Sequence, residues 1–216
     1  MKIDLGCGAN KHPHYFGIDL RPMPGVDLVC DINRPLPLPD DSVYFVMASR
    51  SLCYVNDLMA VMAELYRICT HKSIVCILAP YAHSFPHMSN PFIKQKFDEY
   101  TPRYVTSHFF QPPHGPICPP LSGYMPDLPV PIDFRLLQME FFYQSPFQQP
   151  LYDPDELEVL KSLQANVVNE IMYHFVVVKY AITTEELEWL SKQTYPEPLA
   201  VTELRNKKDD GGYLVF

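Results

Sequence analysis

The sequence predicts an α/β protein built on a parallel sheet, and three observations predict it. Short apolar segments bounded by turn residues recur at strand length through the first 80 residues. A segment with helical periodicity, residues 56–69, lies between two of these segments. The run from Ile74 to Ala79 is apolar without interruption, as in a strand buried on both faces. Strands that alternate with connectors and a helix are typical of βα units.

The first 80 residues supply most of the predicted sheet. We expect strands at residues 3–5, 15–20, 26–30, 43–48 and 74–79. The helix at 56–69 is capped by Asn56 or Asp57. Its apolar residues recur at helical spacing and form one stripe: Leu58, Val61, Met62, Leu65 and Ile68.

The pattern changes after Pro80. Fifteen of the 23 prolines lie between Pro80 and Pro154, and residues 111–131 alone hold eight, which excludes a regular helix or a central strand there. We expect partial helix at 91–100, a strand at 134–143, a helix at 153–164 and a long strand at 169–182. A last helix starts at a cap, Thr183 or Thr184, and the tail, residues 195–216, is expected to be loose or only partly packed.

The composition is that of one folded domain, 1–216, with 47 % hydrophobic and 19 % charged residues. A net charge of −8 argues against wrapping a nucleic-acid backbone. No apolar run reaches the roughly 18 residues that a membrane span needs, and the first residues do not resemble a signal peptide. Six cysteines without metal-ligand spacing predict reduced thiols, no metal site and a cytoplasmic location.

A glycine-rich turn, Gly6-Cys7-Gly8, follows the first predicted strand. Glycine lets a ligand approach the backbone, and ligands of open α/β sheets lie beyond the carboxyl ends of the strands. Asp19 ends the second strand, where it can bind both hydroxyls of a ribose. Asp31 ends the third, where it can reach an adenine edge, and Ile32 can pack on the ring. A dinucleotide is disfavoured, because Lys11 replaces the third glycine and Asp19 comes too early.

Several stretches resemble the class I S-adenosylmethionine-dependent methyltransferases. "IDLGCGAN" is similar to their first motif, "FGIDL" to the second, and "VCDI" with "PLPLPDDSVYFV" to the third strand and the start of the fourth. The helix and strand of "LMAVMAELYRICTHKSIVCILAP" follow in the same order. The resemblance covers residues 2–80. It implies a Rossmann-like, mostly parallel seven-stranded sheet with helices on both faces and an antiparallel last strand.

The same resemblance implies S-adenosylmethionine as cofactor and S-adenosylhomocysteine as product. Asp4 would orient the loop or the methionine amine, and Gly6 and Gly8 would approach the methionine part. The implied cofactor-binding residues are Asp4, Gly6, Cys7, Gly8, Asp19, Leu20, Asp31, Ile32 and Ser49. The chain lacks the helices that precede the first strand in this family, so the proline-rich segment, the tail or a second subunit is expected to cover that side.

Acceptor groups of such a fold lie near the ends of the fourth and fifth strands. Candidates are Arg50, Ser51 and Tyr54 after the fourth strand, and Tyr81, His83, Ser84 and His87 after the fifth. We predict His83 as the base, since imidazole titrates near neutrality, and Tyr54 as a positioning hydroxyl. Simple packing roles are the alternative for both residues.

Residues 81–149, rich in aromatic side chains and proline, are the predicted substrate-recognition insertion or cap. The predicted function is methyl transfer to a small-molecule acceptor, without nucleic-acid or membrane partners. Two alternatives stay open: a protein methyltransferase, and a weakly active or inactive methyltransferase-like binding subunit. The uncovered side makes a homodimer a candidate assembly.

Overall fold

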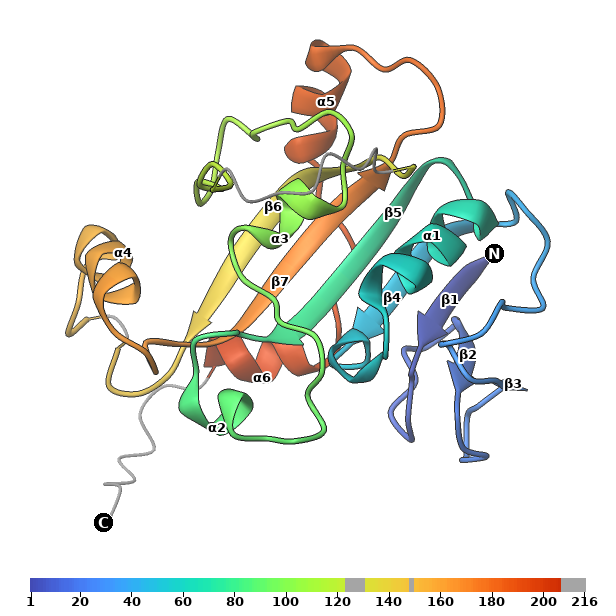
Figure 1. Cartoon of the computed structure of the whole chain (residues 1–216), viewed down its shortest axis with the longest axis horizontal. Helices are drawn as coiled ribbons and strands as arrows, with labels where there is room; N and C mark the ends of the chain where they lie inside the picture. The colour runs from blue at the N-terminus through green and yellow to red at the C-terminus, as the bar shows by residue number, and fades with distance from the viewer. Residues whose placement is uncertain (123–130, 148–149, 207–216) are drawn as a thin grey trace.

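The computed structural model describes residues 1–122, 131–147 and 150–206. Within these ranges seven strands form one sheet in the order β3-β2-β1-β4-β5-β7-β6 (Figure 1). Neighbouring strands from β3 to β5 pair in parallel, and β7 is antiparallel to both β5 and β6. The predicted Rossmann-like sheet with its antiparallel last strand is therefore confirmed. The strands are β1 (Lys2–Leu5), β2 (Phe16–Asp19), β3 (Leu28–Val29), β4 (Val43–Ser49), β5 (Cys69–Pro80), β6 (Phe134–Tyr143) and β7 (Val168–Val177).

The central strand β5 is buried on both faces, as its apolar run predicts. Val75, Ile77 and Ala79 face one hydrophobic cluster. The alternate residues Ile74, Cys76 and Leu78 face the other. Because successive side chains of a strand point to opposite faces, this division shows that both faces of the sheet are covered.

One face is covered by α1 (Leu58–Ile68) and by the segment containing α3 (Thr101–Tyr104). The cap of α1 is Asp57, whose carboxylate accepts a hydrogen bond from the Ala60 amide at 3.0 Å. Its predicted stripe is buried: Val61, Met62, Leu65 and Ile68 pack on the sheet. A helix and the strands next to it in sequence therefore form this face.

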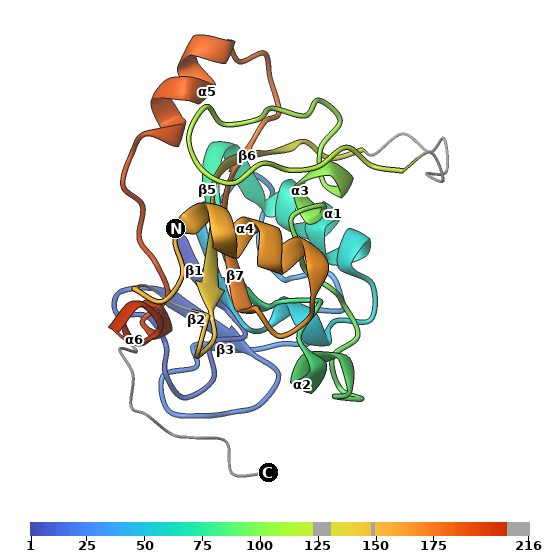
Figure 2. The ribbon, with the colours of Figure 1, turned by 90° about the vertical axis from the view of Figure 1, so that its left-hand side faces the viewer.

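The opposite face is covered by residues 178–206, here named the C-terminal arm. The arm contains α5 (Thr184–Ser191) and α6 (Ala200–Asn206), and Figure 2 shows both helices across the sheet from α1 and α3. Leu187 and Val201 are buried against the sheet, at 2 % and 1 % exposure. Residues 195–206 of the predicted tail are partly packed: Pro198 and Val201 are buried, whereas several of their neighbours are exposed. Residues 207–216 lie outside the described part of the chain.

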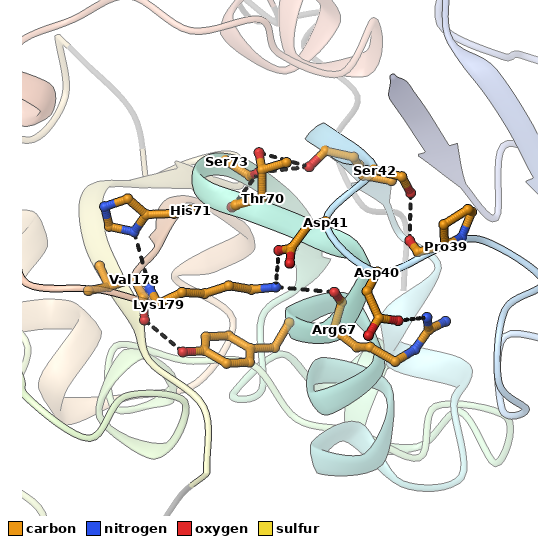
Figure 3. A network of polar contacts seen from close by, with 12 residues as sticks. Pro39, Asp40, Asp41, Ser42, Arg67, Thr70, His71, Ser73, Val178 and Lys179 are labelled. Carbon is orange, nitrogen blue, oxygen red and sulfur yellow. Dashed lines mark hydrogen bonds and ion pairs between the residues drawn. The ribbon is translucent and has the colours of Figure 1, made fainter.

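A polar network fixes the turn before β4 at the edge opposite the carboxyl ends of the parallel strands (Figure 3). The Arg67 guanidinium at the end of α1 donates to the Asp40 carboxylate at 2.5 Å and to the Leu38 carbonyl at 2.9 Å. Lys179, just after β7, pairs with Asp41 at 2.5 Å and donates to the Arg67 carbonyl at 3.1 Å. The segment of prolines and aspartates before β4 is thus held against the end of α1 and the residue after β7.

The predicted insertion, residues 81–149, contains the sheet strand β6. Between β5 and β6 the described residues form only two helices of four residues, α2 (Phe85–Met88) and α3. The partial helix expected at 91–100 is wrong, because Phe97 pairs with Tyr81 in an isolated parallel bridge. A longer helix, α4 (Pro154–Leu163), connects β6 to β7 and begins with a complete capping box at Asp153. No helix of the described residues is long and apolar enough to cross a bilayer.

Candidate functional site

Two cavities lie at the edge where β1, β2, β3 and β4 end. The first, of about 610 Å³, is lined mainly by residues that follow β2, β3 and β4. The second, of about 690 Å³, lies over the glycine turn and reaches the C-terminal arm. Gly6 and Arg50 line both cavities, so the two spaces adjoin at these residues. Each volume falls in the range of about 300–1,000 Å³ typical of small-molecule sites.

The glycine turn has a backbone that other residues adopt only with strain. Gly6 and Gly8 have φ angles of 70° and 56°. A side chain on Gly6 would place its Cβ 2.3 Å from the Cβ of Ser51, whereas a Cβ on Gly8 would meet nothing within 4 Å. Gly6 is therefore required by close packing against the end of β4, and Gly8 leaves open space on the side of the second cavity.

Two carboxylates hold the turn. Asp19 Oδ2 accepts a hydrogen bond from the Gly8 amide at 2.9 Å, and its Oδ1 accepts one from the Arg21 amide at 3.0 Å. Asp4 Oδ2 accepts a hydrogen bond from the His12 amide at 2.7 Å. Burial raises the pKa of Asp4, and its hydrogen bond from His12 opposes that shift. Of the two roles predicted for Asp4, the structure shows the loop-orienting one.

Asp31 is positioned beside Asp19 in the first cavity. Its Oδ1 accepts hydrogen bonds from the Asn33 amide at 3.0 Å and the Asn33 side chain at 2.8 Å. These bonds lower the pKa of Asp31, so it is a carboxylate at neutral pH. Ile32 lines the same cavity and offers an apolar surface between the polar groups.

All nine predicted cofactor residues line one cavity or the other. Asp19, Leu20, Asp31 and Ile32 line the first, and Asp4, Cys7, Gly8 and Ser49 line the second, with Gly6 in both. Burial raises the pKa of Cys7 to about 11, so this side chain is a neutral thiol at neutral pH. The structure therefore brings together residues as far apart in the sequence as Asp4 and Ser49.

A half-buried ion pair between Arg50 and Glu170 lies where the cavities adjoin. Arg50 directly follows β4 with a left-handed φ of 55°. Its Nε and Nη2 donate to the two carboxylate oxygens of Glu170 at 2.5 and 2.7 Å. The Glu170 side chain is 5 % exposed and that of Arg50 is 45 % exposed. These bonds raise the pKa of Arg50, so its guanidinium is charged. The buried Glu170 carboxylate holds this guanidinium, and Arg50 lines both cavities.

Of the two predicted catalytic residues, Tyr54 lines a cavity of the site and His83 does not. Tyr54 lines the first cavity, and burial raises the pKa of its phenol. His83 lines neither of the two cavities. Its Nε2 lies 3.9 Å from Asp98, its ring lies 5.4 Å from that of Tyr81, and its carbonyl accepts from the Asn166 amide. The structure does not place His83 with the other site residues: its neighbours are Asp98 and Tyr81, and Tyr81 pairs with Phe97.

Sequence reasoning missed the contribution of the C-terminal arm. Pro198, Leu199, Ala200 and Glu203 line the second cavity. Nothing in their spacing indicates a site, and the apolar residues Val201 and Leu204 could have suggested that this segment docks. Glu170 could have been found, since it is the carboxylate of an otherwise apolar strand. No group of three or more His, Cys, Asp or Glu side chains in the described ranges is arranged to hold a metal.

Comparison with known proteins agrees with this geometry. Residues 3–77 match a family model described as a methyltransferase domain. That segment carries the glycine turn, Asp19, Asp31 and the strands from β1 to most of β5. Residues 3–77 are thus similar to a methyltransferase domain, and the strand order agrees with the sheet that the resemblance implies. That similarity implies S-adenosylmethionine as cofactor, and the residues predicted to bind it line the two cavities.

Solved structures with a similar arrangement come from several organisms. One is the complex between the Haloferax volcanii Trm112 methyltransferase activator and a methyltransferase, at 15 % identity, covering 84 % of this chain and 83 % of that one, with a TM-score of 0.49. A SAM-dependent methyltransferase from Archaeoglobus fulgidus has 13 % identity, coverage of 81 % and 85 %, and a TM-score of 0.49. One from Aquifex aeolicus has 11 % identity, coverage of 82 % and 81 %, and a TM-score of 0.45. The curated proteins compared gave no match.

Proposed function

We propose that this protein transfers a methyl group from S-adenosylmethionine to a small-molecule acceptor. The observation that carries the proposal is the meeting of two cavities at Gly6 and Arg50, with every predicted cofactor residue in their lining. A ribose would be held by Asp19, an adenine by Asp31 and Ile32, and the methionine part beside Gly8 and Ser49. When bound, the cofactor supplies an electrophilic methyl group on a sulfonium.

The acceptor is assigned to the outer part of the first cavity. Tyr54, Phe92 and Lys94 line it there and belong to none of the predicted cofactor contacts. Phe92 is 72 % exposed and Tyr54 47 % exposed, so both can contact a molecule arriving from solvent. The net charge of −8 favours a small acceptor over a nucleic acid.

Positioning is the main catalytic task that these residues can perform. The raised pKa of Tyr54 keeps its phenol protonated at neutral pH, so Tyr54 can orient an acceptor by a hydrogen bond but does not remove its proton. His83 lies away from the cavity, which leaves proximity and alignment as the source of rate enhancement. This arrangement suits an acceptor that loses its proton to water or is already nucleophilic.

Replacement of Asp19 tests the cofactor assignment. Asp19→Ala removes the acceptor atoms for the ribose and the partner of the Gly8 amide. We expect the thermal shift of the wild-type protein with S-adenosylhomocysteine to be lost, with affinity reduced at least about tenfold. Asp155→Ala, on the exposed first turn of α4, is the matched control and should keep the full shift. An unchanged shift in Asp19→Ala would show that the ribose binds elsewhere.

Transfer of a labelled methyl group tests the acceptor class. The protein is incubated with S-adenosylmethionine labelled in the methyl group and a cell extract separated into small molecules and macromolecules. Label in a new small molecule supports the proposal. Label in precipitated protein would instead identify a protein methyltransferase. Binding of S-adenosylhomocysteine without any transfer would favour a binding subunit.

A further inference from the structure

The second cavity is built from two distant parts of the chain. Asp4 and Gly8, near the N-terminus, lie on one side, and Leu199, Ala200 and Glu203 of the C-terminal arm lie on the other. Figure 1 shows α6 at the lower edge of the sheet, where β4 and β5 end. The predicted methionine end of the cofactor site is therefore covered by a segment outside the matched residues 3–77.

The arm is fastened in this position by contacts on two sides of α6. Val201 is 1 % exposed and packs in the hydrophobic cluster beneath the arm. Arg205 pairs with Glu140 of β6 at 2.5 Å and with Glu197 of the arm at 2.6 Å. Glu203 lies between these two anchors in sequence, so its backbone is held at the rim of the cavity.

Two opposite charges face this cavity. The guanidinium of Arg50 uses Nε and Nη2 for Glu170, and its Nη1 donates to no group in the described ranges. The carboxylate of Glu203 has no hydrogen-bond or ion-pair partner within those same ranges, and its charge contributes to the raised pKa of Arg50. Both groups line the second cavity.

Other charged groups of the cavity are already engaged. Lys11 pairs with Asp27 at 2.7 Å. Asp4 is 4 % exposed and holds the His12 amide. A cation that enters the cavity therefore finds the Glu203 carboxylate as its accessible unpaired anion, and an anion finds the free edge of Arg50.

We propose that Glu203 is a specificity residue that binds the ammonium group of the amino-acid end of the cofactor, opposite a carboxylate held by Arg50. This inference rests on the proposed function. The amino-acid end carries one ammonium and one carboxylate, which matches the two unpaired groups in number and sign. A charged hydrogen bond in a partly enclosed cavity is stronger than one between neutral groups. The arm would thereby select ligands with an intact amino-acid end.

Two ligands separate this role from a general effect on the site. S-adenosylhomocysteine carries the ammonium and the carboxylate, whereas 5′-methylthioadenosine has the adenosine and the sulfur but no amino-acid group. Binding of both is measured by calorimetry to the wild-type protein and to Glu203→Gln, which keeps the size of the side chain but removes its charge. We expect Glu203→Gln to bind S-adenosylhomocysteine about five- to tenfold more weakly and 5′-methylthioadenosine unchanged.

The control variants address folding and position. Glu188→Gln makes the same change on the exposed side of α5, away from the cavity, and should leave both affinities unchanged. Glu203→Asp keeps the charge and should recover part of the lost affinity. Melting temperatures of all variants in the absence of ligand show whether the arm remains docked.

The other possible results contradict either the inference about Glu203 or the proposed function. Equal weakening of both ligands in Glu203→Gln would mean that Glu203 supports the site without contacting the ammonium, which overturns the inference. No weakening of either would overturn it as well, while the proposed function would stand. If the wild-type protein bound neither ligand, the proposed function would fail and the inference with it.

Discussion

The two faces of the sheet are covered in different ways. On one face, α1 lies between β4 and β5 in sequence and packs on the strands it connects. On the other, the cover comes from the C-terminal arm, which follows β7 and reaches back across the sheet to the glycine turn. The first face is covered by a helix next in sequence to its strands, and the second by a segment that lines a cavity with residues almost 200 positions earlier. The comparison suggests that α1 mainly stabilises the sheet, whereas the C-terminal arm also completes the second cavity.

The largest expected effect is on the α1 face. Leu65 is fully buried in the main hydrophobic cluster. Leu65→Ala should lower the free energy of unfolding by about 2–5 kcal/mol, measured by urea denaturation, because it removes a buried side chain and leaves a cavity. Met59 of the same helix is 38 % exposed, so Met59→Ala should change the free energy of unfolding by less than about 0.5 kcal/mol. Similar values for the two variants would mean that α1 is not packed as described.

A smaller effect on stability, with a larger one on binding, is expected on the arm face. Val201→Ala removes about two methyl groups from the cluster under α6 and should lower the free energy of unfolding by about 1–2 kcal/mol. Affinity for S-adenosylhomocysteine should also fall, because α6 lines the second cavity, whereas folded Leu65→Ala should retain it. Thr202→Ala, exposed on α6, is the control. If Leu65→Ala lost binding and Val201→Ala retained it, the arm face would not be the one on which ligand binding depends.

The smallest expected effect depends on pH. His174 of β7 is 1 % exposed beneath the arm, its Nε2 lies 3.2 Å from the Pro196 carbonyl, and its ring stacks near Tyr195 at 5.4 Å. Burial lowers the pKa of His174 below its ordinary value of 6.5. Between that lowered pKa and 6.5 the unfolded chain binds more protons, so its contribution to stability is complete above about pH 7 and is lost on acidification.

The measurement is the free energy of unfolding as a function of pH. His174→Gln keeps a hydrogen-bond donor for Pro196 but does not titrate, so the decrease on acidification should be shallower than in the wild-type protein. The same slope in both proteins would show that His174 is not the group responsible. His71, near the start of β5, also has a pKa lowered by burial. The same measurement on His71→Gln shows how much His71 contributes to the slope.

Local patterns in the sequence predicted the cofactor half well. Periodicity placed β1, β2, β4, β5 and α1, and the motif positions named nine residues that all line the two cavities. Strand alternation and the rule that ligands bind beyond the carboxyl ends of parallel strands are sufficient for this result. The roles of the individual residues stay predictions until binding is measured.

The second half was less predictable because its placement depends on tertiary contacts. His83 lies three residues after β5, and nothing in its neighbours indicates that Tyr81 pairs with Phe97 or that His83 is absent from the lining of the two cavities. The arm docks through buried apolar residues such as Leu187 and Val201, and Arg205 pairs with Glu140 of the distant strand β6. Part of the predicted tail therefore forms a wall of the candidate site.

The shared wall of the second cavity has a consequence for synthesis of the protein. Glu203 leaves the ribosome almost 200 residues after Asp4 and Gly8, which line the same cavity. At about 5–20 residues per second, the interval is on the order of 10–40 s. The cavity described here cannot form on the nascent chain during that interval, even when β1, β2 and β4 have already paired. Ligand binding that requires the arm therefore begins only after residue 203 has emerged.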